Sequence, residues 1–238
     1  MKIEGRNAVS EAIKSGKTID RVLVKNGMRD EQSRALVSAI KAAGVKVHFV
    51  DKVTIDGESA TGKHQGFIAF VTDYRYAEME DLLSARKGAA PFIVVLDGVE
   101  DPHNLGSVIR VCECAGANGL IIGKHRSAAV NETVMRISEG SANHLKIARV
   151  GNINAAVDFL KKNGVWVYAV ELGGEDIYKT DLTGALALVI GGEDTGVNRL
   201  TREKCDKTVT IPMMGKVNSL NASVAAGVAV FEAVRQRR

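Results

Sequence analysis

Two spacings of apolar residues alternate along the second part of this 238-residue chain. Short unbroken apolar runs predict strands that are covered on both faces, and they lie at 92–96, 120–122, 145–148, 166–170, 186–190 and 208–211. Between them, apolar residues at helical spacing predict helices at 104–115, 153–163 and 220–235. This alternation predicts an α/β fold with a mainly parallel sheet and helices on both faces.

The first part of the chain has its own pattern. Residues 1–73 show strand-like runs at 19–24, 45–49 and 66–71, separated by helical patterns. They predict a small α/β domain in which no catalytic constellation is visible. A charged stretch at 74–90 is the predicted linker, and 91–238 is the predicted second domain.

Composition narrows the class of protein. A hydrophobic content of 45% with 25% charged residues predicts a soluble globular protein with a substantial core. We find no apolar run long enough to span a bilayer, and the first residues lack the apolar core of a signal peptide. We therefore expect a cytoplasmic protein. The net charge of +4, with basic clusters at 124–126, 199–204 and 235–238, is compatible with a nucleic-acid partner without demanding one.

Several kinds of chemistry lack their signals. The five histidines show no metal-binding spacing, so no metal is predicted. No nucleophile elbow or phosphate-binding P-loop occurs, and the strand at 92–96 is not followed by the G-x-G-x-x-G of a nicotinamide-dependent oxidoreductase. Three cysteines are too few and too badly spaced for a disulfide framework or zinc knuckle: Cys112, Cys114 and Cys205.

Two loops near the end of the chain predict a ligand crevice. Three glycines at 191, 192 and 196 follow the strand 186–190, and a second strand stops at Pro212. A polar stretch, 217–223, then opens a final helix that begins with many small residues. Loops at the carboxyl ends of strands in an α/β sheet form ligand sites, and glycine lets a ligand approach the backbone closely.

Three segments, 96–110, 188–196 and 211–225, resemble the three motifs of the SpoU (TrmH-type) RNA ribose 2′-O-methyltransferases, in the family's order. The resemblance implies a SPOUT-type domain with a trefoil knot, S-adenosyl-L-methionine as methyl donor, and a homodimer through the knotted domain. Each active site would be completed near the dimer interface.

A weaker resemblance covers the first domain, on the residues 5–9 and 64–66. They are similar to the ribosomal-protein-like RNA substrate-binding domain that precedes the ribosomal RNA members of the family. Residues 138–145 and 231–237 are similar to the branch that methylates guanosine in 23S ribosomal RNA. Transfer RNA is the alternative substrate, and a non-catalytic RNA-binding protein with the same fold is the alternative function.

The motifs carry the candidate site residues over to this sequence. The resemblance implies that the cofactor is held mainly through the main chain of Gly191, Gly192, Gly196, Ile211, Met213 and Leu220. It implies substrate and catalytic roles for Asn104, Arg110, Glu193, Ser219 and Asn221.

Each of these assignments has a structural alternative. The glycines could make a turn only, and Ser219 or Asn221 could cap the last helix. Arg110 could form a surface ion pair with Glu113. The role of Arg110 in catalysis also has two readings: it takes the proton of the ribose hydroxyl, or it grips a substrate phosphate while a neighbour or water takes that proton.

Overall fold

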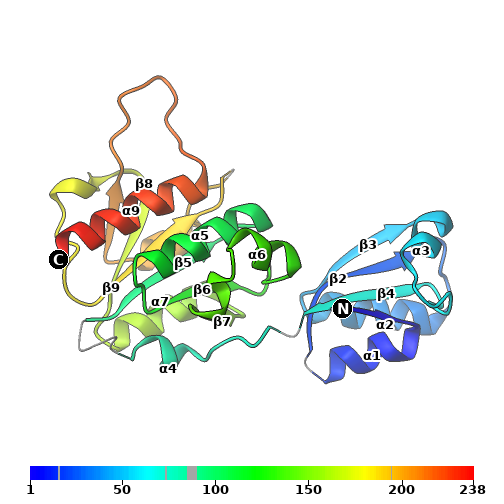
Figure 1. Cartoon of the computed structure of the whole chain (residues 1–238). Coiled ribbons are helices and arrows are strands. Elements are labelled where there is room, and N and C mark those ends of the chain that lie inside the picture. The colour runs from blue at the N-terminus through cyan, green and yellow to red at the C-terminus, as the bar shows by residue number, and fades with distance from the viewer. Residues whose placement is uncertain (16, 73, 85–89, 194) are drawn as a thin grey trace. The chain divides into compact units, whose positions relative to one another are not determined.

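The computed structural model describes residues 1–15, 17–72, 74–84, 90–193 and 195–238 (Figure 1). The chain divides into two units, Met1–Arg75 and Tyr76–Arg238. Among the described residues, no helix combines the length and apolarity needed to cross a membrane.

The first unit is a four-stranded sheet with a core on each face. The strand order is β1 (Lys2–Glu4), β4 (Phe67–Thr72), β2 (Thr18–Lys25) and β3 (Lys46–Val50), with β2 and β3 parallel and the other pairs antiparallel. Two helices pack their apolar residues on one face, and a short helix packs on the other; these are α1 (Arg6–Lys14) and α2 (Glu31–Ala42), then α3 (Lys52–Glu58).

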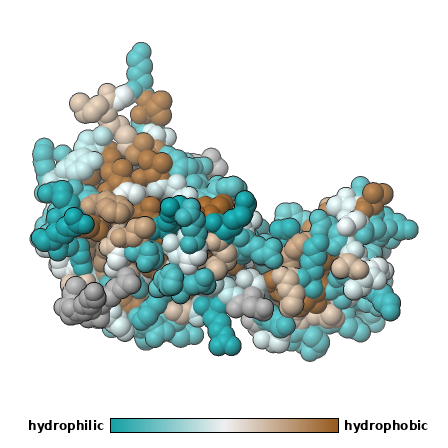
Figure 2. Space-filling model, viewed as in Figure 1, coloured by the Kyte–Doolittle hydropathy of each residue, from teal (hydrophilic) through white to brown (hydrophobic). Residues whose placement is uncertain are grey.

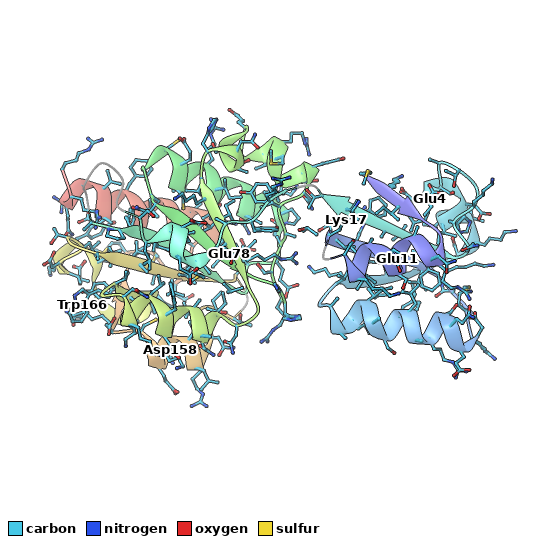
Figure 3. The ribbon with its side chains drawn as sticks, turned by 90° about the horizontal axis from the view of Figure 1, so that it is seen from below. Glu4, Glu11, Lys17, Glu78, Asp158 and Trp166 are labelled. Atoms are coloured by element: carbon cyan, nitrogen blue, oxygen red, sulfur yellow. The ribbon has the colours of Figure 1, made fainter. Side chains whose placement is uncertain are left out.

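A carboxylate joins the first strand of this unit to the loop after α3. Glu4 (Figure 3) accepts hydrogen bonds from Thr61 Oγ1 at 2.5 Å, the Ala60 N–H at 2.6 Å and Ser59 Oγ at 2.7 Å. The hydroxyl groups of Thr61 and Ser59 are the largest causes that lower the pKa of Glu4 from its usual 4.5 to about 2. The ionised carboxylate therefore stabilises the fold.

We expect Glu4→Gln to remove a pH-dependent part of this stability. A carboxyl group with a lowered pKa stabilises the fold fully above its unfolded value, and this stability is lost as the pH falls from about 4.5 towards 2. The difference in free energy of unfolding between wild type and variant should thus be largest near neutral pH and shrink below pH 4.5. Urea titrations at several pH values measure it. A difference that stays constant with pH would contradict this assignment.

The second unit is a six-stranded, entirely parallel sheet, as the alternating pattern predicts. Its order is β10 (Lys207–Thr210), β8 (Trp166–Asp176), β9 (Leu186–Gly191), β5 (Phe92–Asp97), β6 (Gly119–Gly123) and β7 (Lys146–Val150). The central strands β5 and β9 are almost completely buried, which is why they read as unbroken apolar runs.

Helices cover both faces of this sheet (Figure 1). On one face α5 contacts both α6 and α9. On the other, α7 contacts α8, and residues of α4 and α7 share a buried core with alternate residues of the central strands. The bounds are α4 (Met79–Leu82), α5 (Pro102–Cys114), α6 (Glu132–Ile137), α7 (Ile153–Lys162), α8 (Arg199–Lys204) and α9 (Ala222–Gln236), with two short 3-10 helices at Ser141–Asn143 and Ile177–Lys179.

Part of the stretch 74–90, which is the predicted linker, packs on the second unit. Ala77 already donates its N–H to the Ile147 carbonyl at 2.8 Å, and Leu82 on α4 is fully buried in the core of the second unit. The apolar positions of this short charged helix are too few to reveal that packing from sequence. Residues 85–89 of the expected linker lie outside the described residues.

Strand β8 runs past the expected end at residue 170. Its polar continuation pairs with β10, where Val209 and Thr210 lie opposite Glu175 and Asp176. A Cβ atom at Gly174 would overlap the Thr208 carbonyl, so glycine allows the two backbones to approach. The apolar pattern stops at Val170 because the later residues of the strand are not covered on both faces.

Candidate functional site

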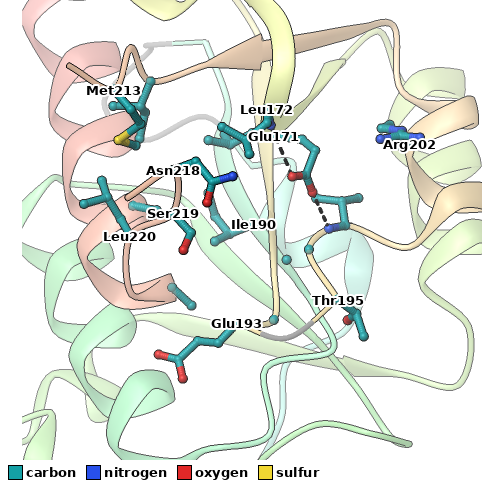
Figure 4. A pocket seen from close by; sticks show the side chains of 18 of the residues that line it. Glu171, Leu172, Ile190, Glu193, Thr195, Arg202, Met213, Asn218, Ser219 and Leu220 are labelled. Carbon is teal, nitrogen blue, oxygen red and sulfur yellow. Dashed lines mark hydrogen bonds between the residues drawn. The ribbon is translucent and has the colours of Figure 1, made fainter. Parts of the chain in front are cut away.

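A cavity of about 500 Å³ lies beside the middle of β8, the carboxyl end of β9 and the start of α9 (Figure 4). Its walls come from the middle of β8, the loop after β9, helix α8 and the segment between β10 and α9. All six residues expected at a cofactor site line it: Gly191, Gly192, Gly196, Ile211, Met213 and Leu220. Glu193 and Ser219 line it too, so the two predicted loops do meet in one crevice.

The glycines of the first loop permit close packing of one backbone against another. A Cβ atom at Gly191 would overlap the main chain of Gly196 and Val197, and one at Gly192 would overlap the Gly98 carbonyl oxygen. Gly192 and Gly196 also bridge each other, with a hydrogen bond of 2.9 Å from the Gly196 N–H. The glycines therefore make the turn and line the cavity at the same time.

Three polar side chains from distant parts of the sequence form one hydrogen-bonded cluster. Asn104 Nδ2 donates to Glu193 Oε1 at 3.1 Å. Asn221 Nδ2 donates to Asn104 Oδ1 at 2.9 Å and also to Glu193 Oε1. The cluster joins α5, the loop after β9 and the start of α9, beside the cavity that Glu193 lines.

Local helix chemistry explains why these side chains are available. Asp101 caps α5 by accepting the His103 N–H at 3.1 Å, and Pro102 is its first residue. The sequence predicted that Asn104 starts the helix, but Asn104 lies inside the first turn of α5. Its side chain is only 6% exposed, and its amide takes part in the cluster.

Helix capping accounts for the hydrogen bonds of only one end of the Asn221 amide. Its Oδ1 caps α9 by accepting the N–H groups of Ser223 at 2.9 Å and Val224 at 3.3 Å. Its Nδ2 remains to hold Glu193 and Asn104. Ser219 precedes the cap and lines the cavity (Figure 4), so the two polar residues have different places.

Arg110 lies apart from this cluster in the single chain. Its side chain is 51% exposed and pairs with Glu139 at 2.8 Å rather than with the expected Glu113. Among the described residues that line the cavity, Arg110 does not occur. The structure thus brings four of the five expected catalytic residues to one place and leaves the fifth on the outer face of α5.

Some charged residues that line the cavity were not predicted from the sequence as site residues, among them Glu171 and Arg202. Glu171 accepts the Val197 N–H at 2.8 Å and lines the cavity beside Leu172 (Figure 4). It is the first charged residue after the apolar run 166–170, and that position at the end of the strand predicted from the sequence was the available signal. Arg202 also lines the cavity and comes from α8, a helix too short to read from periodicity.

Two of the cysteines, Cys112 and Cys205, are buried or partly buried, which lowers the reactivity of their thiols. Burial raises the pKa of the Cys205 thiol to about 12, and burial also raises that of Cys112. Both are therefore protonated at neutral pH and are poor nucleophiles. Within the described ranges, no group of three or more histidine, cysteine or acidic residues could hold a metal ion.

Comparison with known proteins identifies the class to which this fold and crevice belong. Residues 91–231 match the SpoU rRNA Methylase family, and residues 2–77 match the family described as RNA 2′-O ribose methyltransferase substrate binding. The second unit is thus a methyltransferase domain, and the first carries the substrate-binding family's sequence.

Whole-chain relatives agree with this class. YacO of Bacillus subtilis, assigned to the TrmH family of tRNA/rRNA methyltransferases, is 39% identical over 98% of this chain and 94% of its own length. A TrmH family tRNA/rRNA methyltransferase of Staphylococcus haemolyticus is 40% identical over 99% and 95%. The chain belongs to the SpoU family of RNA methyltransferases.

Solved structures show the same fold. The SpoU methyltransferase AviRb from Streptomyces viridochromogenes, in complex with AdoMet, has a TM-score of 0.64 at 25% identity, over 99% of this chain and 90% of that one. AdoMet-bound rRNA methyltransferase from Sinorhizobium meliloti gives 0.60 at 26% identity, over 98% and 86%. The predicted SPOUT-type α/β fold with a preceding substrate-binding domain is confirmed, and the chain is an RNA methyltransferase whose family uses S-adenosylmethionine.

Proposed function

We propose that this protein transfers the methyl group of S-adenosylmethionine to the ribose 2′-hydroxyl of a guanosine in 23S ribosomal RNA, in the cytoplasm. The observation that carries the choice of ribosomal RNA is coverage. The AdoMet-bound rRNA methyltransferase matches 98% of this chain, whereas the A. aeolicus TrmH/SpoU tRNA modifying enzyme matches 66% at 31% identity, with a TM-score of 0.57. Transfer RNA remains the second candidate, because the relatives of full length carry both names.

The first cavity fits the methyl donor in size and chemistry. Its volume of about 500 Å³ lies in the range of small-molecule sites. Ile190, Ile211 and Leu220 offer an apolar wall for a flat base, and the glycine loop offers main-chain donors and acceptors. The carboxylates of Glu171 and Glu193 favour a positively charged sulfonium nearby. When bound, S-adenosylmethionine supplies an electrophilic methyl group.

The polar cluster beside the cavity would position the ribose. Because Asn221 is fixed by capping α9 and Asn104 is nearly buried, both amides are held rigidly against Glu193. A rigid set of hydrogen-bonding groups can orient a hydroxyl for attack without reorganising during the reaction. Ser219, on the cavity wall, adds a hydroxyl that can donate to or accept from the substrate.

In a homodimer, Arg110 would lie beside the first cavity of the partner subunit. Large apolar side chains are exposed around the loop between β10 and α9 and along α9 (Figure 2): Met214, Val217, Val224 and Phe231. Val224 and Phe231 lie seven residues apart and thus on one face of α9, which packs along α5, the helix of Arg110. A second copy covering this face would place Arg110 near the cavity of its partner, where a guanidinium grips a substrate phosphate well and takes up a proton poorly.

We expect Arg110→Ala to lower turnover by about 100-fold while the affinity for S-adenosylmethionine stays within about threefold. Glu193→Ala should also be inactive. If each site uses the arginine of its partner, mixing the two inactive variants restores one complete site in each mixed dimer. About a quarter of wild-type activity then returns after random exchange of subunits. Methyl-tritium incorporation into RNA measures it; no recovery in dimers shown to have exchanged would place Arg110 and Glu193 in the same chain's site.

Mapping of methylated riboses tests the function as a whole. Total RNA from cells with and without the protein is compared by reverse transcription at low nucleotide concentration and by mass spectrometry. The proposal expects one 2′-O-methylguanosine of 23S ribosomal RNA to disappear. A lost position in transfer RNA would support the second candidate. Unchanged RNA, together with calorimetric binding of S-adenosylmethionine, would support a non-catalytic RNA-binding protein.

A further inference from the structure

A second cavity, of about 380 Å³, opens at the carboxyl ends of β5, β6 and β7. It shares two residues with the first cavity, Thr195 and Gly196, and Thr195 lies at the edge of the first cavity in Figure 4. The loop after β9 therefore forms a common wall between the two. Apart from Gly196, none of the expected site residues lines the second cavity.

Hydrogen-bond acceptors stand in the wall of this cavity. Asp97 ends β5 and is half-buried, and its Oδ2 accepts the Asn198 N–H at 2.9 Å. A carboxylate has about four lone-pair sites, so both of its oxygens can accept a further bond. Glu100 contributes a second carboxylate to the lining. Asn154 also lines the cavity, and its Oδ1 is buried with no hydrogen-bond partner among the described residues.

The mouth of the cavity has the opposite charge. His125 and Arg126 line it from the exposed loop after β6, and Lys124 precedes them. Arg126 has a left-handed backbone with φ of 47°, a conformation that few non-glycine residues adopt. The Lys124 N–H is bonded to the Val150 carbonyl at 2.8 Å, which fixes the start of this loop on β7.

The acidic interior and the basic mouth of the second cavity together favour one kind of ligand. An anion in the interior would meet the two carboxylates, and the start of α7 offers it little, because Asn152 already accepts the N–H groups of Asn154 at 2.9 Å and Ala155 at 3.3 Å. A neutral flat group with N–H donors on its edge suits the interior instead. A phosphate attached to that group suits the basic mouth. A nucleotide has both parts.

We infer that the second cavity binds a guanine base of the substrate RNA, with Asp97 accepting the two adjacent N–H donors of the guanine edge and Arg126 contacting a phosphate of that nucleotide. Bases splayed out of single-stranded RNA are recognised by hydrogen bonds to such edges. Uracil and cytosine present a narrower set of donors to a carboxylate, so the cavity prefers guanine. The inference rests on RNA being the substrate, as proposed above, and it assigns a contact outside the methyl-transfer site.

Two variants separate the base contact from the phosphate contact. Asp97→Asn keeps an oxygen for the Asn198 N–H but replaces the second oxygen by a donor. The full-length protein, saturated with S-adenosylhomocysteine, is titrated with guanosine, cytidine and uridine 5′-monophosphates by NMR. We expect Asp97→Asn to lower the affinity for the guanosine nucleotide about tenfold and to abolish the preference for it. Arg126→Ala should weaken all three nucleotides by a similar factor.

Several results would overturn the inference: equal affinities of the three nucleotides for wild type, shifts at Ile190 and Ile211 instead of at Gly123 and Gly151, or no binding at millimolar concentration. Binding of S-adenosylmethionine and methyl transfer to RNA are measured on the same preparation. If these two succeed and the nucleotide preference is absent, only this inference fails. If the cofactor does not bind, the proposed function fails with it.

Discussion

Gly191→Ala is expected to lower the affinity for S-adenosylmethionine by about 10- to 100-fold. The added methyl group would overlap the main chain of Gly196 and Val197, which cannot move aside as a flexible side chain could. Both of those residues line the first cavity, so the loop must shift and the cavity must change shape. Isothermal calorimetry with S-adenosylmethionine measures the loss, and a thermal unfolding curve shows that the variant has folded.

Gly215→Ala is the matched control. Gly215 lies in the other loop of the crevice, and a Cβ atom there meets nothing within 4 Å. The same glycine-to-alanine change should therefore leave the affinity for the cofactor within about twofold, because it adds no overlap. Wild-type affinity in a folded Gly191→Ala variant would show that the loop after β9 is not part of the cofactor site.

The parallel sheet and the crevice could be predicted because both leave a local signature. Strands β5 and β9 are buried on both faces, so their sequences are unbroken apolar runs. The glycines at 191, 192 and 196 follow such a run directly, and loops that follow parallel strands all lie at one edge of the sheet. Strand direction and residue type together therefore indicated where the crevice lies.

The contacts inside the site could not be predicted in the same way. Asn104 and Asn221 are 117 residues apart and bond to each other only because α5 and α9 pack on the same face of the sheet. Nothing in the spacing of either motif specifies that pairing. Glu171 and Arg202 could not be predicted as site residues for a different reason. Glu171 lies on a half-exposed extension of β8, and Arg202 lies on a helix of six residues.

Whether Arg110 serves the site of its own chain or that of a second copy is not decided by the fold of one chain. Its exposed side chain and its ion pair with Glu139 are what a single subunit shows. A sequence motif reports that residues act together without reporting whether they come from one subunit or two. The mixing of inactive variants described above decides between these cases, since no hydrogen bond within the described chain does.

Glu193→Ala is expected to lower turnover by about 100-fold or more, with a smaller loss of affinity for S-adenosylmethionine. Glu193 Oε1 is the common acceptor of the Asn104 and Asn221 amides, so its loss leaves both without their shared partner. Asn104 is only 6% exposed, and water replaces the lost bond poorly there. Single-turnover methyl transfer to RNA from cells that lack the protein measures the effect on the chemical step.

Glu193→Gln then separates geometry from charge. A glutamine can place its amide oxygen where Oε1 lies and keep both hydrogen bonds, but it carries no negative charge. If the carboxylate acts only by holding the two amides, the Gln variant recovers most of the turnover that the Ala variant loses. If its charge stabilises the sulfonium or an arginine, the turnover of the Gln variant stays close to that of the Ala variant.

Glu175→Ala is the control: it removes an exposed carboxylate that pairs with Lys207 at 3.0 Å, and it should leave turnover unchanged. Wild-type turnover in Glu193→Ala would remove this residue from the proposed site.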